Sequence, residues 1–456
     1  MARTRAAARR SIDRLPAEAL EAVLARLPAD SRARAACVSR AWRSAVACPK
    51  SWHELDLTRA GGLTCALGPA AILDAPSLAQ RLVHVRVLRL PAGPDAPLEA
   101  LRAVLRLLRD KTLSGVELRL EGALKPRALA IDGSNYGALL GALTQEPALT
   151  LITLDALHCS PELGATVFCL PRFSVPHVIF GLACAAAAAA PVERLLSALE
   201  RYTPLTTLSV TNAPFTTQQL TRVVDVALAR SLPKLELTSR SLGPDSVPEL
   251  ARLLRSSTSL RHLLVQGESY SNDAPLFNTA NVALFSGTLR DTVTLKHLTL
   301  SNIGPSWRCA APAVCSALAG HPTLESLLLW ENVGQCVDLS TLDAALLDLL
   351  IADAPALQRL ELNFSVSAYG QPSLTLPRTF DALARNTHLR ALKIGALETS
   401  NALLRTALQA MQANTGLREA TIVLNDDFRV LSATLLNQLH AAMSHMPTFE
   451  RRDDVF

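Results

Sequence analysis

The chain has 456 residues, of which 49% are hydrophobic, only 4% aromatic and 19% charged. This much apolar content excludes a mostly disordered chain, and so few aromatic residues exclude a core built from a few large rings. Many similar layers rich in Leu and Ala, as in repeat proteins, fit this composition better. The 45 basic and 40 acidic residues leave a net charge of +5, which does not require nucleic acid as a partner.

The first ten residues carry four arginines, Arg3, Arg5, Arg9 and Arg10. We predict a solvated basic tail over residues 1–10, with a nuclear-entry patch as the alternative. No apolar run follows the arginines, as a secretory signal would require. The nine cysteines include no Cys-x-x-Cys pair, which favours small buried thiols in a reducing compartment. We therefore expect the protein in the cytoplasm or the nucleus.

Residues 11–57 predict a small helical domain. Leu20, Val23, Leu24 and Leu27 recur on one face of a first helix, and Pro28 ends it. A second helix begins shortly afterwards. Two or three short helices cannot bury a full core by themselves, so we expect their apolar faces to meet another chain or the next domain.

This segment resembles the F-box motif. The resemblance rests on the Leu15-Pro16 start, on a second pair at Leu27-Pro28, and on the run Cys37-Val38-Ser39-Arg40-Ala41-Trp42-Arg43. It implies helices that dock on the Skp adaptor of cullin-based ubiquitin ligases. The residues it assigns to adaptor binding are Leu15, Pro16, Leu20, Leu24, Leu27, Pro28, Val38 and Trp42. The alternative is a helical cap that covers the open end of a repeat array.

The rest of the chain repeats the pattern Leu-x-x-Leu-x-Leu about every 30 residues. One wider interval contains the strand-like run His177-Val178-Ile179-Phe180. Clear copies start at Leu205, Leu260, Leu295, Leu324, Leu357, Leu389 and Leu417, and weaker ones at Leu82, Leu113, Leu149 and Leu235.

Helical patterns lie between these strands, for example at 248–254 and 344–350. Each unit is therefore a strand, a loop and a helix that stacks on its neighbours. The resemblance is to ribonuclease-inhibitor-like leucine-rich repeats. We predict an α/β protein: a short helical F-box, a linker or first cap over 58–80, and a leucine-rich-repeat solenoid over 81–456. The solenoid would have about 11–12 units, with a curved parallel sheet inside and helices outside.

No sequence motif for catalysis, nucleotide binding or metal binding is present. Cys309, Cys315 and His321 have a spacing that fits no common zinc ligand set. The longest apolar run, Val178–Cys184 with the alanines after it, is shorter than the roughly 20 residues that cross a bilayer. We therefore expect no enzyme activity, no catalytic residue, no cofactor, no metal and no membrane partner.

Side chains between the template leucines should face the concave side of the sheet, because strand side chains alternate. Trp330 stands out among few aromatics, as an exposed anchor for a partner or as a residue packed under a loop at Asn332. Mixed charges along these rows argue against a phosphate backbone as ligand. The candidate partner-binding residues are His262, His297, Thr299, Leu328, Trp330, Arg359, Glu361 and Lys393.

The combined resemblance implies a substrate-recognition adaptor of a Skp–cullin–F-box ubiquitin ligase. Its F-box would bind the Skp adaptor, and its repeats would hold an unidentified target protein. The same layout would suit a bacterial effector that borrows a host ligase. The alternative function is a leucine-rich-repeat scaffold or inhibitor without a ligase link.

Overall fold

The structure is a computed structural model. It describes residues 54–57, 84–91, 97–113, 115–124, 133–159, 161–181, 189–211, 216–238, 242–267, 276–301, 307–331, 339–352, 356–364, 376–397 and 401–424, with Leu82 and isolated positions between 16 and 45. The chain divides into two compact units, Met1–Leu205 and Thr206–Phe456.

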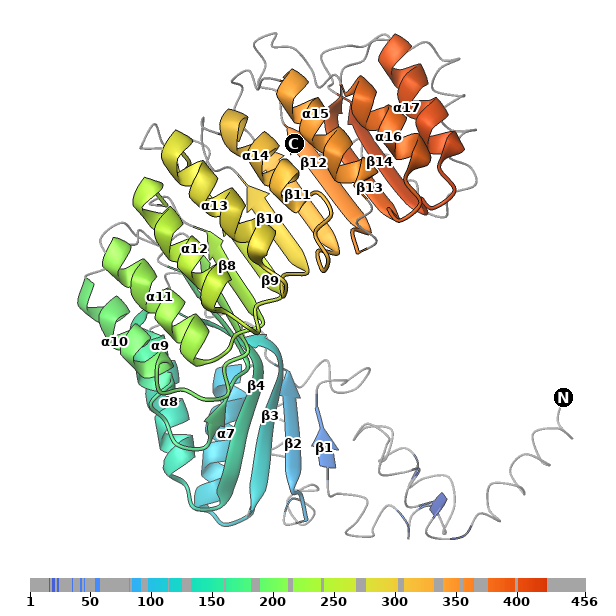
Figure 1. Ribbon diagram of the computed structural model, residues 1–456. Helices are drawn as coiled ribbons and strands as arrows, with labels where there is room; N and C mark the ends of the chain where they lie inside the picture. Colours follow the sequence, from blue (N-terminus) through green and yellow to red (C-terminus); the bar gives the residue numbers. More distant parts are fainter. Residues whose placement is uncertain are drawn as a thin grey trace, which may run out of the picture. The chain divides into compact units, whose positions relative to one another are not determined.

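The first unit contains a parallel sheet in the order β1-β2-β3-β4-β6, with β5 beside β4. Helices connect the strands and lie on one side of the sheet (Figure 1). The elements are β1 Glu54–Asp56, β2 Val87–Pro91, α7 Pro97–Arg109, β3 Val116–Leu124, α8 Gly133–Gln145, β4 Leu149–Cys159, α9 Pro161–Val167, β5 Phe173–Ser174, β6 His177–Gly181 and α10 Ala189–Leu199.

The second unit repeats one strand–helix motif along a parallel sheet in the order β7 to β14 (Figure 1). The elements are β7 Thr207–Thr211, α11 Thr217–Ala229, β8 Lys234–Thr238, the short 3-10 helix η2 Pro244–Ser246, α12 Val247–Ser256, β9 His262–Gln266, α13 Thr279–Asp291, β10 His297–Ser301, α14 Trp307–Leu318, β11 Ser326–Glu331, α15 Leu339–Ile351, β12 Arg359–Phe364, α16 Pro377–Arg385, β13 Ala391–Leu397, α17 Asn401–Ala413 and β14 Glu419–Leu424.

Template leucines form the core between sheet and helices. Leu263, Leu298, Leu327 and Leu360 lie in register on neighbouring strands, and each is buried. Because alternate side chains of a strand point to the same face, one continuous apolar row results. No single unit could bury this row alone, which confirms the predicted stacked repeat.

Two of the predicted repeat starts were wrong, each by three residues. Leu235 pairs with Leu208 and Leu263 inside the strands, so it is the second leucine of its unit, and the template starts at buried Leu232. Likewise buried Leu88 is the second leucine of its unit, in the row that continues to Leu118, so the template starts at buried Val85 and not at Leu82. The error arose because an apolar residue three positions away from each true start also fits the leucine pattern.

The parallel ladder also begins earlier than the predicted solenoid start at residue 81. Leu55 of β1 is buried and pairs with Leu88 of β2. The first described strand therefore lies within the segment expected to be the F-box.

Four of the described turns from helix to strand in the second unit share one pattern of side-chain hydrogen bonds, here called the turn device. The residue three positions before the template leucine accepts backbone N–H groups two and three residues ahead. Asn386 Oδ1 accepts from His388 and Leu389, and Asn414 Oδ1 accepts from Gly416 and Leu417. The donors and acceptors of each turn are thus satisfied by a short polar side chain, as in Asx turns.

Ser257 and His321 occupy the equivalent position in two other turns. Ser257 Oγ accepts from Leu260 N–H, and His321 Nδ1 accepts from Leu324 N–H at 3.1 Å. The histidine therefore serves as the neutral tautomer with Nδ1 unprotonated.

Candidate protein-binding surfaces

The N-terminal segment is described at a few of the predicted adaptor-binding positions. Pro16 is exposed, Trp42 is half-buried, and Leu20 is only 4% exposed, so Leu20 packs inside this chain. Val23, which the sequence placed on the apolar helical face but did not single out for adaptor binding, is helical and 49% exposed. The remaining positions, Leu15, Leu24, Leu27, Pro28 and Val38, lie outside the described residues.

The sheet face away from the helices in the second unit carries the predicted partner-binding side chains. Strand register places them in parallel rows across β9 to β13. The first row contains Lys234, His262, His297, Ser326, Arg359 and Ala391. The second row contains Glu236, Leu264, Thr299, Leu328, Glu361 and Lys393. All eight candidates thus lie on five adjacent strands.

Glu361 forms the centre of a charged cluster at one end of this face. Lys393 Nζ lies 2.5 Å and Arg359 3.6 Å from its carboxylate. Glu361 is only 8% exposed, whereas Arg359 is well exposed. The carboxylate therefore orients the two cations and presents little surface of its own to a partner.

A second cluster occupies the other end. Lys234 Nζ lies 2.8 Å from Glu236 Oε1, and His262 Nε2 lies 4.0 Å from the same oxygen. Burial acts to raise the pKa of Glu236, but the hydrogen bond and charge of Lys234, with smaller effects of Ser209 and His262, lower it overall. Burial lowers the pKa of His262, helped by Lys234 and opposed by Glu236.

The two imidazoles of His262 and His297 lie side by side, with ring centroids 5.6 Å apart. Repulsion from His297 is one of the smaller effects that lower the pKa of His262. The ring pair adds a flat, weakly polar surface next to the charged cluster.

Uncharged side chains lie between the clusters. Leu264, Thr299, Leu328 and Trp330 are all half-buried on β9 to β11. Trp330 is partly exposed and lies outside the core, in register with Asn363. Sequence reasoning missed Lys234 and Glu236 as members of this face, although their places in the template already contained the signal.

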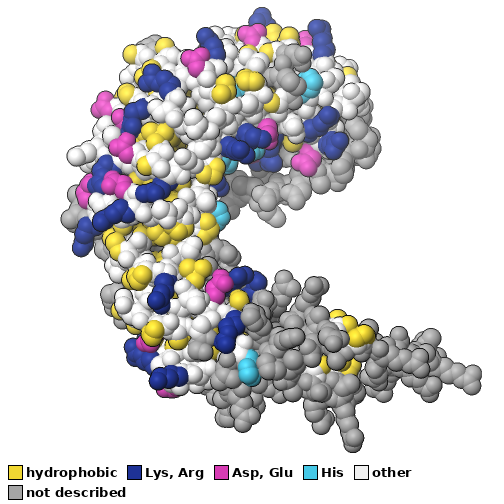
Figure 2. All heavy atoms as spheres, turned by 60° about the horizontal axis from the view of Figure 1, so that its bottom comes forward, with side chains coloured by type: hydrophobic (Ala, Val, Ile, Leu, Met, Phe, Trp, Pro, Cys, Tyr) yellow, Lys and Arg dark blue, Asp and Glu magenta, His cyan; other side chains and the backbone are white. Residues whose placement is uncertain are grey.

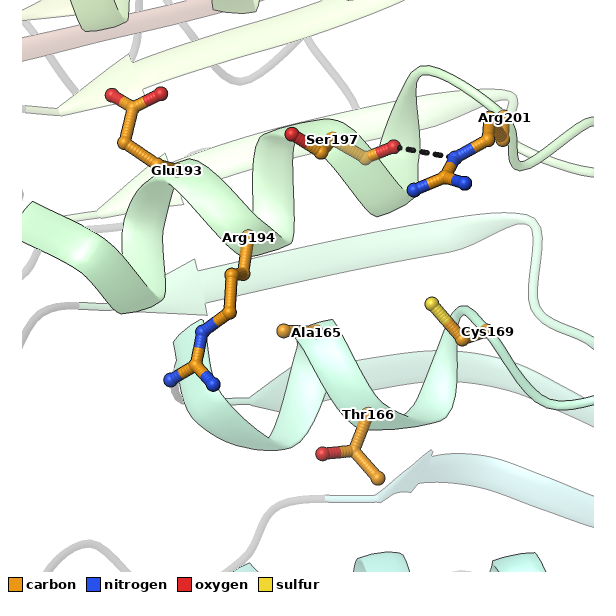
Figure 3. Close-up of a pocket in the computed structure, with 7 residues that line it drawn as sticks. All are labelled: Ala165, Thr166, Cys169, Glu193, Arg194, Ser197 and Arg201. Carbon is orange, nitrogen blue, oxygen red and sulfur yellow. Dashed lines mark hydrogen bonds between the residues drawn. The ribbon is translucent and has the colours of Figure 1, made fainter.

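A pocket of about 530 Å³ lies in the first unit between α9 and α10 (Figure 3). It is lined by Ala165, Thr166, Cys169, Glu193, Arg194, Ser197 and Arg201. Arg201 donates from Nε to the Ser197 carbonyl at 3.2 Å. In Figure 3 the exposed Cys169 thiol and the Glu193 carboxylate lie at opposite ends of the pocket, so they form no nucleophile–base pair there.

Within the part of the chain that the structure describes, no three His, Cys, Asp or Glu side chains gather as a metal site. Cys315 and His321 are both buried, and burial raises the pKa of the Cys315 thiol to about 12. Over the same described residues, no helix is long and apolar enough to span a bilayer.

Comparison with solved structures gives several low-identity similarities. The Rad7–Elc1 complex of yeast is 12% identical, over 76% of this chain and 85% of that chain, with a TM-score of 0.38. The protein LegL7 of Legionella pneumophila, a leucine-rich-repeat-containing protein, is 14% identical, over 87% and 99%, with a TM-score of 0.30. TLR13 in complex with ssRNA13 is 13% identical, over 75% and 50%, with a TM-score of 0.39. No curated protein matches the chain.

Parallel strands repeated on a leucine template, with helices on one side, define the class of leucine-rich-repeat solenoids. Residues 12–58 match the family model described as F-box-like. The chain thus joins an F-box-like domain to a leucine-rich-repeat solenoid, which confirms the predicted combination.

Proposed function

We propose that this protein is a substrate-recognition adaptor of a Skp–cullin–F-box ubiquitin ligase, acting in the cytoplasm or the nucleus. The F-box-like match over residues 12–58 is the observation that carries the proposal. In this role the chain contributes proximity and no covalent chemistry of its own. Other subunits would transfer ubiquitin to the target that the solenoid holds.

The adaptor-binding surface would include exposed Val23 with the predicted Pro16 and Trp42. Leu20 is a poor probe of this surface, because its side chain is buried and its replacement would damage the fold. Val23→Glu places a charge on an exposed apolar position, so the chain should stay folded while an apolar interface is disrupted.

The test is binding of the purified full chain to a purified Skp adaptor, measured by titration calorimetry. Val293→Glu is the matched control, since Val293 is an exposed valine, at 65%, in the second unit. We expect wild type and Val293→Glu to bind equally and Val23→Glu to bind at least about tenfold more weakly. A folded wild type that does not bind the adaptor would overturn the ligase proposal.

That outcome would favour the second candidate function, a leucine-rich-repeat scaffold or inhibitor whose N-terminal helices are a cap. The observation that favours it is the burial of Leu20 and of Leu55 within the chain, since a cap packs its apolar residues against its own array.

The target would bind the sheet face around Leu328 and Trp330. This surface has an apolar centre between two charged clusters, which is the arrangement of an interface with a buried anchor and a polar rim. Leu328→Glu should abolish target capture while leaving Skp-adaptor binding unchanged, and unchanged capture would move the target site elsewhere.

A further inference from the structure

One edge of the second unit gathers basic side chains. In these repeats the last turn of each helix and the start of the next strand lie along the same edge of the layers (Figure 1). On this edge, here called the basic edge, the described basic residues are Arg230, Lys234, Arg255, Arg261, Arg290, Lys296, Arg359, Arg385, Arg390 and Arg418. The described acidic residues are Asp291, Glu325, Asp348 and Glu419. Figure 2 shows dark blue Lys and Arg side chains recurring over the described surface.

Five of these arginines have exposed side chains that form no hydrogen bond or close ion pair with the described residues, although the charge of Arg261 acts on Glu325. They are Arg255, Arg261, Arg290, Arg385 and Arg418. By contrast, Lys296 is paired with Glu325 at 2.5 Å, and Arg390 donates to the Gly416 carbonyl at 2.9 Å. The unpaired guanidinium groups are therefore available to a ligand from outside the chain.

Helix dipoles explain only part of this pattern. A cation in the last turn of a helix is favourable, which accounts for Arg255, Arg290 and Arg385. Arg261 and Arg418 instead precede strands and gain nothing from a helix end. Their repetition at equivalent template positions needs another reason.

The unpaired arginines form two groups. Arg255, Arg261 and Arg290 lie on the α12–α13 repeats, and Arg385 and Arg418 lie on the α16–β14 repeats. Between them the edge carries Glu325, which is paired with Lys296, and then Asp348 and Arg359, so the charges cancel there, and the α14 turn contributes no cation. Positive charge is thus interrupted along the edge.

We propose that the basic edge binds an acidic segment of a partner protein, with two short runs of Asp or Glu. Planar guanidinium groups pair with carboxylates through two parallel hydrogen bonds, so arginine suits this ligand better than lysine. A nucleic-acid backbone is uniformly charged and would lie against Glu325 and Asp348. The described residues of the edge also include no Phe, Tyr or Trp ring on which a base could stack.

The experiment uses the full chain and a fluorescein-labelled deca-glutamate peptide, with binding followed by fluorescence anisotropy. The test variant is Arg385→Glu with Arg418→Glu. The matched control is Arg378→Glu with Arg405→Glu, exposed arginines in the N-terminal halves of α16 and α17, with the same change in net charge. Thermal melts establish that both variants are folded, and Arg385→Gln with Arg418→Gln replaces the test variant if it is not.

We expect wild type and the control to bind the peptide and the test variant to bind about tenfold more weakly, with affinity falling as salt rises. Absence of binding by wild type, or equal weakening by both variants, would overturn the proposal. A duplex DNA that binds more tightly than the peptide, with the same dependence on Arg385 and Arg418, would overturn it in favour of nucleic acid. The proposal does not rest on the ligase role, and adaptor binding should be unchanged in the test variant.

Discussion

Asn414 offers the sharpest test of how the repeats are held together. Its side chain is only 4% exposed and makes four hydrogen bonds. Oδ1 accepts from the N–H groups of Gly416 and Leu417, at 2.9 and 2.8 Å. Nδ2 donates to the carbonyls of Leu383 and Asn386 in the preceding repeat, at 2.6 Å each. One side chain therefore closes its own turn and joins two repeats.

Asn414→Ala removes all four bonds and leaves four backbone groups without these partners. At about 1 kcal/mol for each net hydrogen bond, the expected loss is about 4 kcal/mol of unfolding free energy. The loss falls on the last described repeats, because the bonds of Asn414 reach back only to the turn before it.

The assay is urea denaturation followed by circular dichroism, with hydrogen exchange at β14 as a local readout. The control is Thr415→Ala, because Thr415 is exposed and adjacent in the same turn. We expect the control to change stability by less than about 0.5 kcal/mol. A loss below about 1 kcal/mol in Asn414→Ala, or unchanged exchange at β14, would refute the reasoning that this side chain joins the repeats.

Three further predictions use the same physics. Burial lowers the pKa of His321 in the folded chain, although the backbone at Thr292 and Leu289 opposes the shift. Folding stability should therefore be full above the ordinary histidine pKa of about 6.5 and fall as the pH drops below it. In denaturation experiments from pH 7.5 to 5, His321→Asn should reduce this dependence of stability on pH. Gly416→Ala should cost about 1–3 kcal/mol of stability derived from Tm, because the new Cβ would lie 2.5 Å from a backbone oxygen. Gly287→Ala should instead stabilise the chain by about 0.5–1 kcal/mol, because Gly287 lies in a helix with open space around it. Equal effects of the two changes would contradict this reasoning. Asp343→Ala should cost about 2–4 kcal/mol by urea denaturation, because this buried carboxylate accepts two N–H groups at the start of α16, and a loss seen equally in Asp348→Ala would argue against it.

Much of the fold could be predicted because its main determinant is periodic. Each template leucine repeats the environment of the one before it, so Leu263, Leu298 and Leu327 already indicate a stacked parallel sheet. The starting residue of each template was harder to predict, because Leu232 and Leu235 both fit a template start. Only strand pairing decides between them.

The turn device was missed although the sequence contains a signal for it. Asn386 and Asn414 each precede a Thr and lie three positions before a template leucine, and Ser257 does the same. His321 occupies the equivalent position but is not a short polar residue. Its role as an acceptor depends on a tautomer that the sequence does not specify.

The sequence predicts which residues lie on the candidate sheet face, but it does not predict how their charged side chains pair. Rows follow from alternation along each strand, so Leu328 and Glu361 could be placed together. Whether Glu361 faces a partner or is covered by Arg359 and Lys393 depends on side-chain lengths across strands. Pairing of this kind arises from tertiary register, which local patterns do not contain.

The turn device and the basic edge are physically connected. Asn414 accepts the N–H of Leu417, and Arg418 follows directly, so the turn fixes the backbone position from which the Arg418 side chain extends. Asn386 does the same for Leu389 before Arg390. Ser257 does so for Leu260 before Arg261, so three of these turns place an arginine directly after the template leucine. Stability and recognition therefore share one determinant on this edge, and changes to the turn should affect acidic-peptide binding even where the chain stays folded.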